Sequence, residues 1–256
     1  MAVTIAVAAV VGLAAGRLAV LAIAWLPGYD PPRRLPSRRC PHGAAGLRPA
    51  DLVPLSGWRS LGRRCPDCGG AVRGAWTWAA EVTTAVVLAL LAVRFGPHPV
   101  LVAYGYLGVT GVALAFIDAR CRRLPDALTL PAYPAGLALL GIAAATSAGG
   151  LRHYLVALAG MAAAWLLFAV QALIYPAGVG WGDVKLSGII GLYLGWLGVG
   201  PLVAGLFAGY LLAAVAGIGL LIAGRASRRS QVPFGPFLLA GALASILLSG
   251  LSNVTI

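Results

Sequence analysis

The sequence Gly-Trp-Gly-Asp-Val-Lys at residues 180–185 lies between two long apolar runs. Asp183 and Lys185 are the only charged residues between positions 152 and 225, and Lys185 is the only lysine in the chain. A carboxylate placed where hydrocarbon meets water is energetically costly and usually has a function. Gly180 and Gly182 allow backbone conformations and close approaches that a Cβ atom would forbid. We therefore expect a functional partner for Asp183 elsewhere in the chain.

The composition predicts an integral membrane protein. Of 256 residues, 60% are hydrophobic and only 10% are charged, which is outside the range of soluble domains. A cleaved signal peptide is the alternative for the first apolar run, but that run lacks a basic N-terminal region. We expect an all-α polytopic membrane protein with about eight transmembrane helices. The runs lie at about residues 3–26, 76–93, 100–117, 127–145, 154–175, 186–197, 202–223 and 234–248.

The basic residues predict the orientation in the membrane. The formal net charge is +12, which could suggest nucleic-acid binding, but the basic residues fall mostly in the loops between apolar runs. Of the 19 basic residues, all but Arg17, Arg94 and Arg152 lie in alternate loops, as the positive-inside rule requires of cytoplasmic loops. We expect a multi-pass protein of the cytoplasmic membrane, with the lipid bilayer and not nucleic acid as its partner. The predicted cytoplasmic loops are residues 27–75, 118–126, 176–185 and 224–232.

The arginine-rich cytoplasmic loop contains a candidate metal site. Cys65 and Cys68 have the Cys-x-x-Cys spacing of a zinc knuckle. Upstream, Cys40 and His42 stand where a second cysteine pair would be expected. One interpretation is a zinc site with Cys40, Cys65 and Cys68 as ligands together with His42, and the other is a decayed knuckle with free thiols. The sequence thus divides into residues 1–75, with the first helix and this loop, and a membrane-embedded domain at 76–256.

Two further charges fall inside apolar runs. Arg17 lies roughly 15 Å from the inner end of the first predicted helix, and Glu81 lies in the second. One interpretation is that Arg17 extends its side chain to the membrane surface. The other, which we favour, is a buried pair between Arg17 and Glu81.

Asp118 is the expected partner of Asp183. It ends the third apolar run at the predicted cytoplasmic face, where Asp183 also lies. Two carboxylates at one depth can share a proton, so that one deprotonates a water while the other donates to a peptide carbonyl. The alternative is that each aspartate caps a helix or binds a local arginine. Lys185 could steady a carboxylate or contact lipid phosphates.

Three motifs occur in order along the chain: Phe-Ile-Asp at 116–118 with Leu-Pro-Asp at 124–126, Gly-Trp-Gly-Asp-Val-Lys-Leu at 180–186, and Pro-Phe-Gly-Pro-Phe at 233–237. Together they resemble the motifs of the prepilin peptidases (type IV leader peptidases), which are Gly-x-Gly-Asp membrane aspartic proteases. The resemblance implies that Asp118 and Asp183 are the catalytic pair. It also implies that the substrates are prepilins or pilin-like precursors, cut at the cytoplasmic face without a cofactor. Gly180 and Gly182 would let the Asp183 backbone approach the substrate strand.

The N-terminal region departs from this family. In bifunctional members it holds two Cys-x-x-Cys pairs and supports methylation of the new N-terminus with S-adenosylmethionine. Here Gly43 stands where the second cysteine of the first pair would fall, and Arg17 interrupts the usual Gly-Ser-Phe-Leu-Asn stretch. Glu81 does match the acidic residue typical of the second helix. These departures argue against methyltransferase activity and against a role for S-adenosylmethionine.

Two other classes of function remain as alternatives. The first is a small ion-coupled transporter or channel whose acidic residues carry ions. Transporters usually place such acids near the bilayer midplane, whereas Asp118 and Asp183 are both expected at its rim, which favours the protease. The second is a metal-binding membrane scaffold in which the cysteine loop is the functional part.

Overall fold

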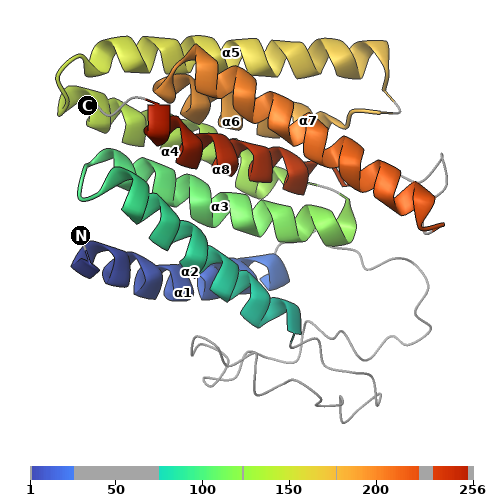
Figure 1. The fold of residues 1–256 in the computed structure, drawn as a ribbon, viewed down its shortest axis with the longest axis horizontal. Helices are drawn as coiled ribbons and strands as arrows, with labels where there is room; N and C mark the ends of the chain where they lie inside the picture. Colours follow the sequence, from blue (N-terminus) through green and yellow to red (C-terminus); the bar gives the residue numbers. More distant parts are fainter. Residues whose placement is uncertain (1, 26–74, 123, 177, 225–232, 253–256) are drawn as a thin grey trace. The chain divides into compact units, whose positions relative to one another are not determined.

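The computed structural model describes residues 2–25, 75–122, 124–176, 178–224 and 233–252, and these residues form eight helices and no strand (Figure 1). Helices satisfy every backbone polar group within one segment, which is what a chain crossing hydrocarbon requires. The expected all-α architecture is confirmed, with one helix for each apolar run. The helices are α1 (Ala2–Trp25), α2 (Ala75–Phe95), α3 (Val100–Cys121), α4 (Asp126–Ala145), α5 (Gly150–Ile174), α6 (Trp181–Leu197), α7 (Val199–Ile222) and α8 (Gly235–Ser252).

Five of the described helices are long and apolar enough to cross a membrane, namely α2, α3, α4, α5 and α7. Helices α1 and α8 contribute shorter apolar stretches, Ala2–Arg17 and Gly235–Ser249, and α6 has 17 residues. A helix needs about 20 residues to span the hydrocarbon core. The chain is therefore a multi-pass membrane protein.

The chain forms two compact units, Met1–Val93 and Arg94–Ile256. In the first unit, α1 and α2 pack backbone to backbone through glycines of α1. A Cβ atom on Gly12 would lie 2.6 Å from the Cα atom of Ala85, and one on Gly16 would lie 2.8 Å from the Cα atom of Glu81. Because real Cβ atoms do not approach other carbons so closely, the two helices could not meet in this way with larger residues at these positions.

The predicted pair between Arg17 and Glu81 is confirmed. Nη1 of Arg17 lies 3.0 Å from Oε1 of Glu81, and the two residues are 6% and 0% exposed. Arg17 therefore does not extend its side chain to the membrane surface. A buried carboxylate is tolerated when it is paired and hydrogen-bonded, so this ion pair explains how α2 accommodates Glu81.

We expect Arg17→Met to destabilise the protein, because Glu81 keeps its burial but loses its ion pair with Arg17. Breaking one side of a buried ion pair costs about 3–5 kcal/mol, whereas replacing both partners by apolar residues is often neutral. Arg17→Met should therefore lower the unfolding midpoint of the protein in detergent micelles, and adding Glu81→Met should restore much of the loss. A double variant no more stable than Arg17→Met would contradict this.

In the second unit, α6 lies at the centre and packs against α4, α5, α7 and α8 (Figure 1). Its residues from Leu186 to Trp196 are all buried. The contact with α5 is made by glycines: a Cβ atom on Gly195 would lie 2.8 Å from the carbonyl oxygen of Val156, and one on Gly160 would lie 2.6 Å from that of Gly191. Small residues at a helix crossing let the backbones approach closely, so α6 is held firmly from the α5 side.

The predicted ends of two helices were wrong, and both lie at the candidate site. Helix α3 was expected to stop at Asp118 but continues to Cys121, because Arg122 takes a left-handed conformation (φ 52°) and donates its N–H to the Asp118 carbonyl. Helix α6 was expected to begin at Leu186 but begins at Trp181. An acidic residue is favourable in the first turn of a helix, where backbone N–H groups are free, so Asp183 belongs to the helix and not to the loop before it.

Candidate active site

Asp118 lies in the last turn of α3 and is 5% exposed. Its Oδ2 atom accepts a hydrogen bond from the backbone N–H of Gly235 at 3.0 Å. Gly235 is the first residue of α8, where backbone N–H groups have no partner within the helix and carry a partial positive charge. The start of α8 thus holds Asp118 by a group that favours its ionised form.

Asp183 lies in the first turn of α6, before the apolar part of that helix and outside the candidate membrane spans. Its Oδ2 atom accepts the backbone N–H of Gly180 at 3.3 Å. Burial of the carboxyl group, and secondly the negative charge of Asp118, raise the pKa of Asp183 to about 6, against the opposing effect of the Gly180 hydrogen bond. The protonated form of Asp183 is therefore populated close to neutral pH.

The two aspartates come from different helices and interact electrostatically. The alternative interpretation of the sequence was that each aspartate caps a helix or binds a local arginine. Asp183 does accept a backbone N–H at the start of its own helix. The ion pairs found among the described residues involve neither aspartate. The site therefore consists of two nearby carboxyl groups, each with a hydrogen bond from a backbone N–H, at the end of α3 and the starts of α6 and α8. Such a pair can hold one proton and one negative charge at the same time.

An aromatic cluster adjoins the pair. The rings of Phe168, Tyr210 and Phe234 pack together, with centroids 5.1 Å to 6.0 Å apart. The hydroxyl of Tyr210 donates a hydrogen bond to Oε1 of Gln171, and the charge of Asp183 acts on Tyr210. Phe234 directly precedes Gly235. The cluster thus places aromatic side chains of α5 and α7 next to the residue that precedes Gly235, close to the carboxyl groups.

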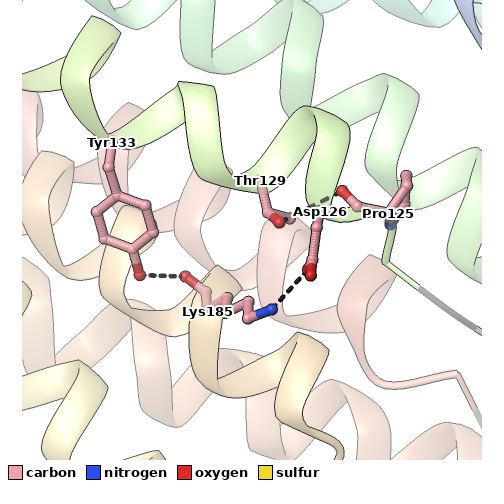
Figure 2. A network of polar contacts seen from close by, with 5 residues as sticks. All are labelled: Pro125, Asp126, Thr129, Tyr133 and Lys185. Carbon is pink, nitrogen blue, oxygen red and sulfur yellow. Dashed lines mark hydrogen bonds and ion pairs between the residues drawn. The ribbon is translucent and has the colours of Figure 1, made fainter.

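Lys185 pairs with a carboxylate, as one of its two sequence interpretations predicted. Its Nζ atom lies 2.6 Å from Oδ1 of Asp126 in the first turn of α4 (Figure 2).

Gly182 lies close to Leu124, which is two positions before Asp126. A Cβ atom on Gly182 would be 3.1 Å from Cβ of Leu124. Asp126 is the first residue of α4 and directly follows Pro125. The segment that follows Asp118 therefore packs against the turn that carries Asp183.

Comparison with known proteins decides the family. The family model described as "Type IV leader peptidase family" matches residues 105–249, and the one described as "Bacterial Peptidase A24 N-terminal domain" matches residues 10–95. The chain belongs to the type IV leader peptidase family. The first match includes every residue of the site described above, and the second covers most of α1 and all of α2.

Curated relatives agree with the family assignment. The chain is 31% identical to a protein of Bacillus subtilis (strain 168), over 83% of this chain and 82% of the relative. It is 34% identical to one of Burkholderia pseudomallei (strain 1026b), over 83% and 67%, and 33% identical to one of Dickeya chrysanthemi, over 92% and 79%. Each is named "Prepilin leader peptidase/N-methyltransferase". No solved structure matches the chain significantly.

These comparisons bear on the alternatives drawn from the sequence. The resemblance to prepilin peptidases is confirmed, and nothing in the family or its members supports a transporter or channel. The names of the relatives include a methyltransferase activity, and for this chain the absence of that activity stays a prediction. The predicted zinc ligands Cys40, Cys65 and Cys68 lie outside the described residues. Within the part of the chain that is described, no three His, Cys, Asp or Glu side chains gather as metal ligands, so zinc binding also stays a prediction.

Some residues of the site were missed at the sequence level. The resemblance singled out residues 233–237 but gave Gly235 no role, because its contribution is a backbone N–H that no side-chain pattern reveals. The sequence also gave no sign of Tyr210 or of Tyr133, whose hydroxyl donates a hydrogen bond to the backbone carbonyl of Lys185, because tyrosines are ordinary residues for apolar helices. Gln171 could have been noticed from the sequence, because it is the polar residue in the long apolar run of α5. An amide in hydrocarbon requires a hydrogen-bonding partner.

Proposed function

We propose that this type IV leader peptidase removes the leader peptide of type IV prepilins or pilin-like precursors, with Asp118 and Asp183 as its catalytic pair. The observation that carries the proposal is the placement of two carboxyl groups on separate helices, close enough for the charge of one to act on the other. Two carboxyl groups that share one proton can activate water and polarise a peptide carbonyl without a cofactor. The names of the curated relatives supply the class of substrate.

The two aspartates have different environments, which suggests different roles. Asp118 accepts a buried N–H from Gly235 and serves as the ionised member, which takes a proton from the attacking water. Asp183, with its raised pKa, serves as the protonated member and donates to the oxygen of the scissile carbonyl. When the resulting tetrahedral intermediate collapses, the bond between carbon and nitrogen breaks and Asp118 gives its proton to the leaving nitrogen. Asp183 takes back the proton of the hydroxyl formed from the carbonyl oxygen, which returns the pair to one shared proton.

The two glycines of the motif have different parts in this proposal. Gly182 is needed for packing, because a Cβ atom there would press against Leu124. Gly180 is exposed and lies beside the carboxyl group, where a Cβ atom would be 3.5 Å from Oδ2 of Asp183. Its small size leaves space over Asp183 for the extended backbone of a substrate. This is the role that the sequence suggested for both glycines.

We place the enzyme in the cytoplasmic membrane with its site on the cytoplasmic side. The basic residues in alternate loops support this orientation. Asp118 and Asp183 lie at the end of one helix and at the beginning of another. A precursor whose leader is cytoplasmic and whose following helix lies in the bilayer would reach the pair from that side.

Cleavage of a pilin precursor tests this function. The chain is co-expressed with a precursor that carries a short leader before its hydrophobic helix, and the product is followed by gel shift and by intact mass. We expect a product shortened by the leader alone. If well-inserted protein leaves a panel of such precursors at full length, the proposed substrate class is wrong.

A further inference from the structure

We propose that Lys185, Asp126 and Tyr133 are positioning residues that fix the turn carrying Asp183 relative to Asp118. We call these three residues the α4–α6 clamp. This inference rests on the proposed roles of the two aspartates. It assigns to the only lysine of the chain a function in catalysis that it performs through Asp183, without contact with the substrate.

Two contacts from α4 converge on one residue of α6. Nζ of Lys185 lies 2.6 Å from Oδ1 of Asp126, and the hydroxyl of Tyr133 donates to the backbone carbonyl of Lys185 at 2.6 Å (Figure 2). Figure 2 shows both side chains of α4 directed toward the start of α6. Asp126 and Tyr133 are two turns apart on α4. Asp126 binds the side chain of Lys185, and Tyr133 binds its backbone.

The position of Lys185 gives these contacts their significance. It follows Asp183 by two residues and lies directly after the first turn of α6. A first turn is the least restrained part of a helix, because its N–H groups have no partners within the helix. A hydrogen bond to the Lys185 carbonyl and an ion pair from its side chain restrain the residue that directly follows this turn.

The α4 residues of the clamp follow Asp118 closely in the sequence. Asp126 begins α4 only a few residues after α3 ends at Cys121, and Asp118 is in the last turn of α3. The α4–α6 clamp therefore joins the segment leaving one aspartate to the turn bearing the other. Leu124 supports the same arrangement by its close packing against Gly182.

The sequence of α6 makes room for the clamp. A Cβ atom on Gly188 would collide with the hydroxyl of Tyr133. The glycine therefore lets Tyr133 cross the surface of α6 and reach the carbonyl of Lys185. Tyr133, Gly188 and Lys185 therefore fit together sterically. A chance contact between a lysine and a nearby carboxylate would not require a glycine at position 188.

The ion pair between Lys185 and Asp126 contributes to the position of Asp183 more than to the stability of the fold. The side chains of Lys185 and Asp126 are 31% and 58% exposed, and ion pairs so accessible to solvent contribute little to folding. Misplacing a catalytic group by about 1 Å can nevertheless cost about 100-fold in rate. We therefore expect loss of the clamp to lower kcat by about 10- to 100-fold, with little change in KM or in the unfolding midpoint.

The test uses the full chain in vesicles of phosphatidylethanolamine and phosphatidylglycerol, with a pilin precursor that the wild-type protein cleaves. Lys185→Met and Asp126→Asn should each lower kcat, and the double variant should be no worse than the more impaired single variant, because both remove one interaction. Tyr133→Phe, which deletes only the hydroxyl, should lower kcat to a smaller extent. Arg152→Met, at the exposed start of α5, is the control and should keep wild-type kcat.

Exchanging the two charges of the clamp tests the ion pair directly. Lys185→Asp combined with Asp126→Lys restores opposite charges, and it should recover part of the kcat lost in either single reversal. Recovery is partial because a lysine is unfavourable in the first turn of α4. The clamp is disproved if well-inserted Lys185→Met keeps wild-type kcat, or if the exchanged pair is no better than the single reversals. It is also disproved if the Lys185→Met defect disappears in vesicles without phosphatidylglycerol, since Lys185 would then act on the anionic lipid headgroup. In each of these outcomes wild-type cleavage leaves the proposed function intact.

Discussion

Asp118→Asn and Asp183→Asn are each expected to abolish leader cleavage while the protein stays folded and inserted in the membrane. An asparagine side chain can neither take the proton of the attacking water nor share a proton with its partner. We expect the cleavage rate to fall by at least about 10⁴-fold in either variant, and the double variant to be no worse than either single one, because groups that act as one unit are strongly non-additive. The rate is measured on a co-expressed or reconstituted pilin precursor by intact mass.

Folding should survive these substitutions, since burying an amide costs no more than burying a carboxylate. Asp126→Asn is the matched control: it makes the same chemical change in the first turn of α4, outside the pair. It should keep measurable cleavage, although at the lower kcat that loss of the α4–α6 clamp predicts. Full cleavage by well-inserted Asp118→Asn or Asp183→Asn protein would disprove the aspartic-protease mechanism for this chain.

Gly235→Ala is expected to lower kcat by about 100-fold through Asp118 alone. The added Cβ atom would lie 2.8 Å from Oδ2 and 3.2 Å from Cγ of Asp118, so one of the groups must move. The end of a side chain moves more easily than the start of a packed helix, and the carboxyl group would therefore leave its position. A displacement of about 1 Å is enough for such a loss, whereas KM and the unfolding midpoint should change little.

Gly217→Ala in α7 is the control for this experiment, because nothing lies within 4 Å of a Cβ atom at that position. It adds the same methyl group to a helix of the same unit, and should leave kcat unchanged. The assay is cleavage of the pilin precursor over a range of concentrations, so that kcat and KM are obtained separately. Wild-type kcat in Gly235→Ala would show that the start of α8 does not determine the position of Asp118.

The helices could be predicted from the sequence because hydrocarbon imposes a simple rule on composition. A run of apolar residues, bounded at one end or at both by a charged residue, a glycine or a proline, marked each of the eight helices of the described residues. The pairing of Arg17 with Glu81 was predictable for a related reason, since a charge inside an apolar run requires an opposite charge. Asp118 and Asp183 were predicted as a pair from their motifs and from the expectation that both lie at the same face of the membrane.

Other features of the site depend on atoms that the sequence does not specify. The ends of α3 and α6 are set by the left-handed conformation of Arg122 and by the hydrogen bond between Gly180 and Asp183, both of which are local backbone events. The contact between Gly235 and Asp118 joins residues far apart in the chain through a backbone N–H. The partner of Lys185 could not be chosen from the sequence, because lipid phosphates and Asp126 offered the same charge to it.

The burial of α6 among its neighbours has a consequence for how the enzyme responds to its membrane. From Leu186 to Trp196 this helix faces other helices, so it has almost no surface on which lipid tails could act. Helices α5 and α7 expose many large apolar side chains, so a thicker or thinner hydrocarbon layer acts on the outer surfaces of these helices. The depth of Asp183 is therefore set by contacts within the protein. An enzyme built in this way can present its carboxyl groups at a constant height in bilayers that differ in thickness.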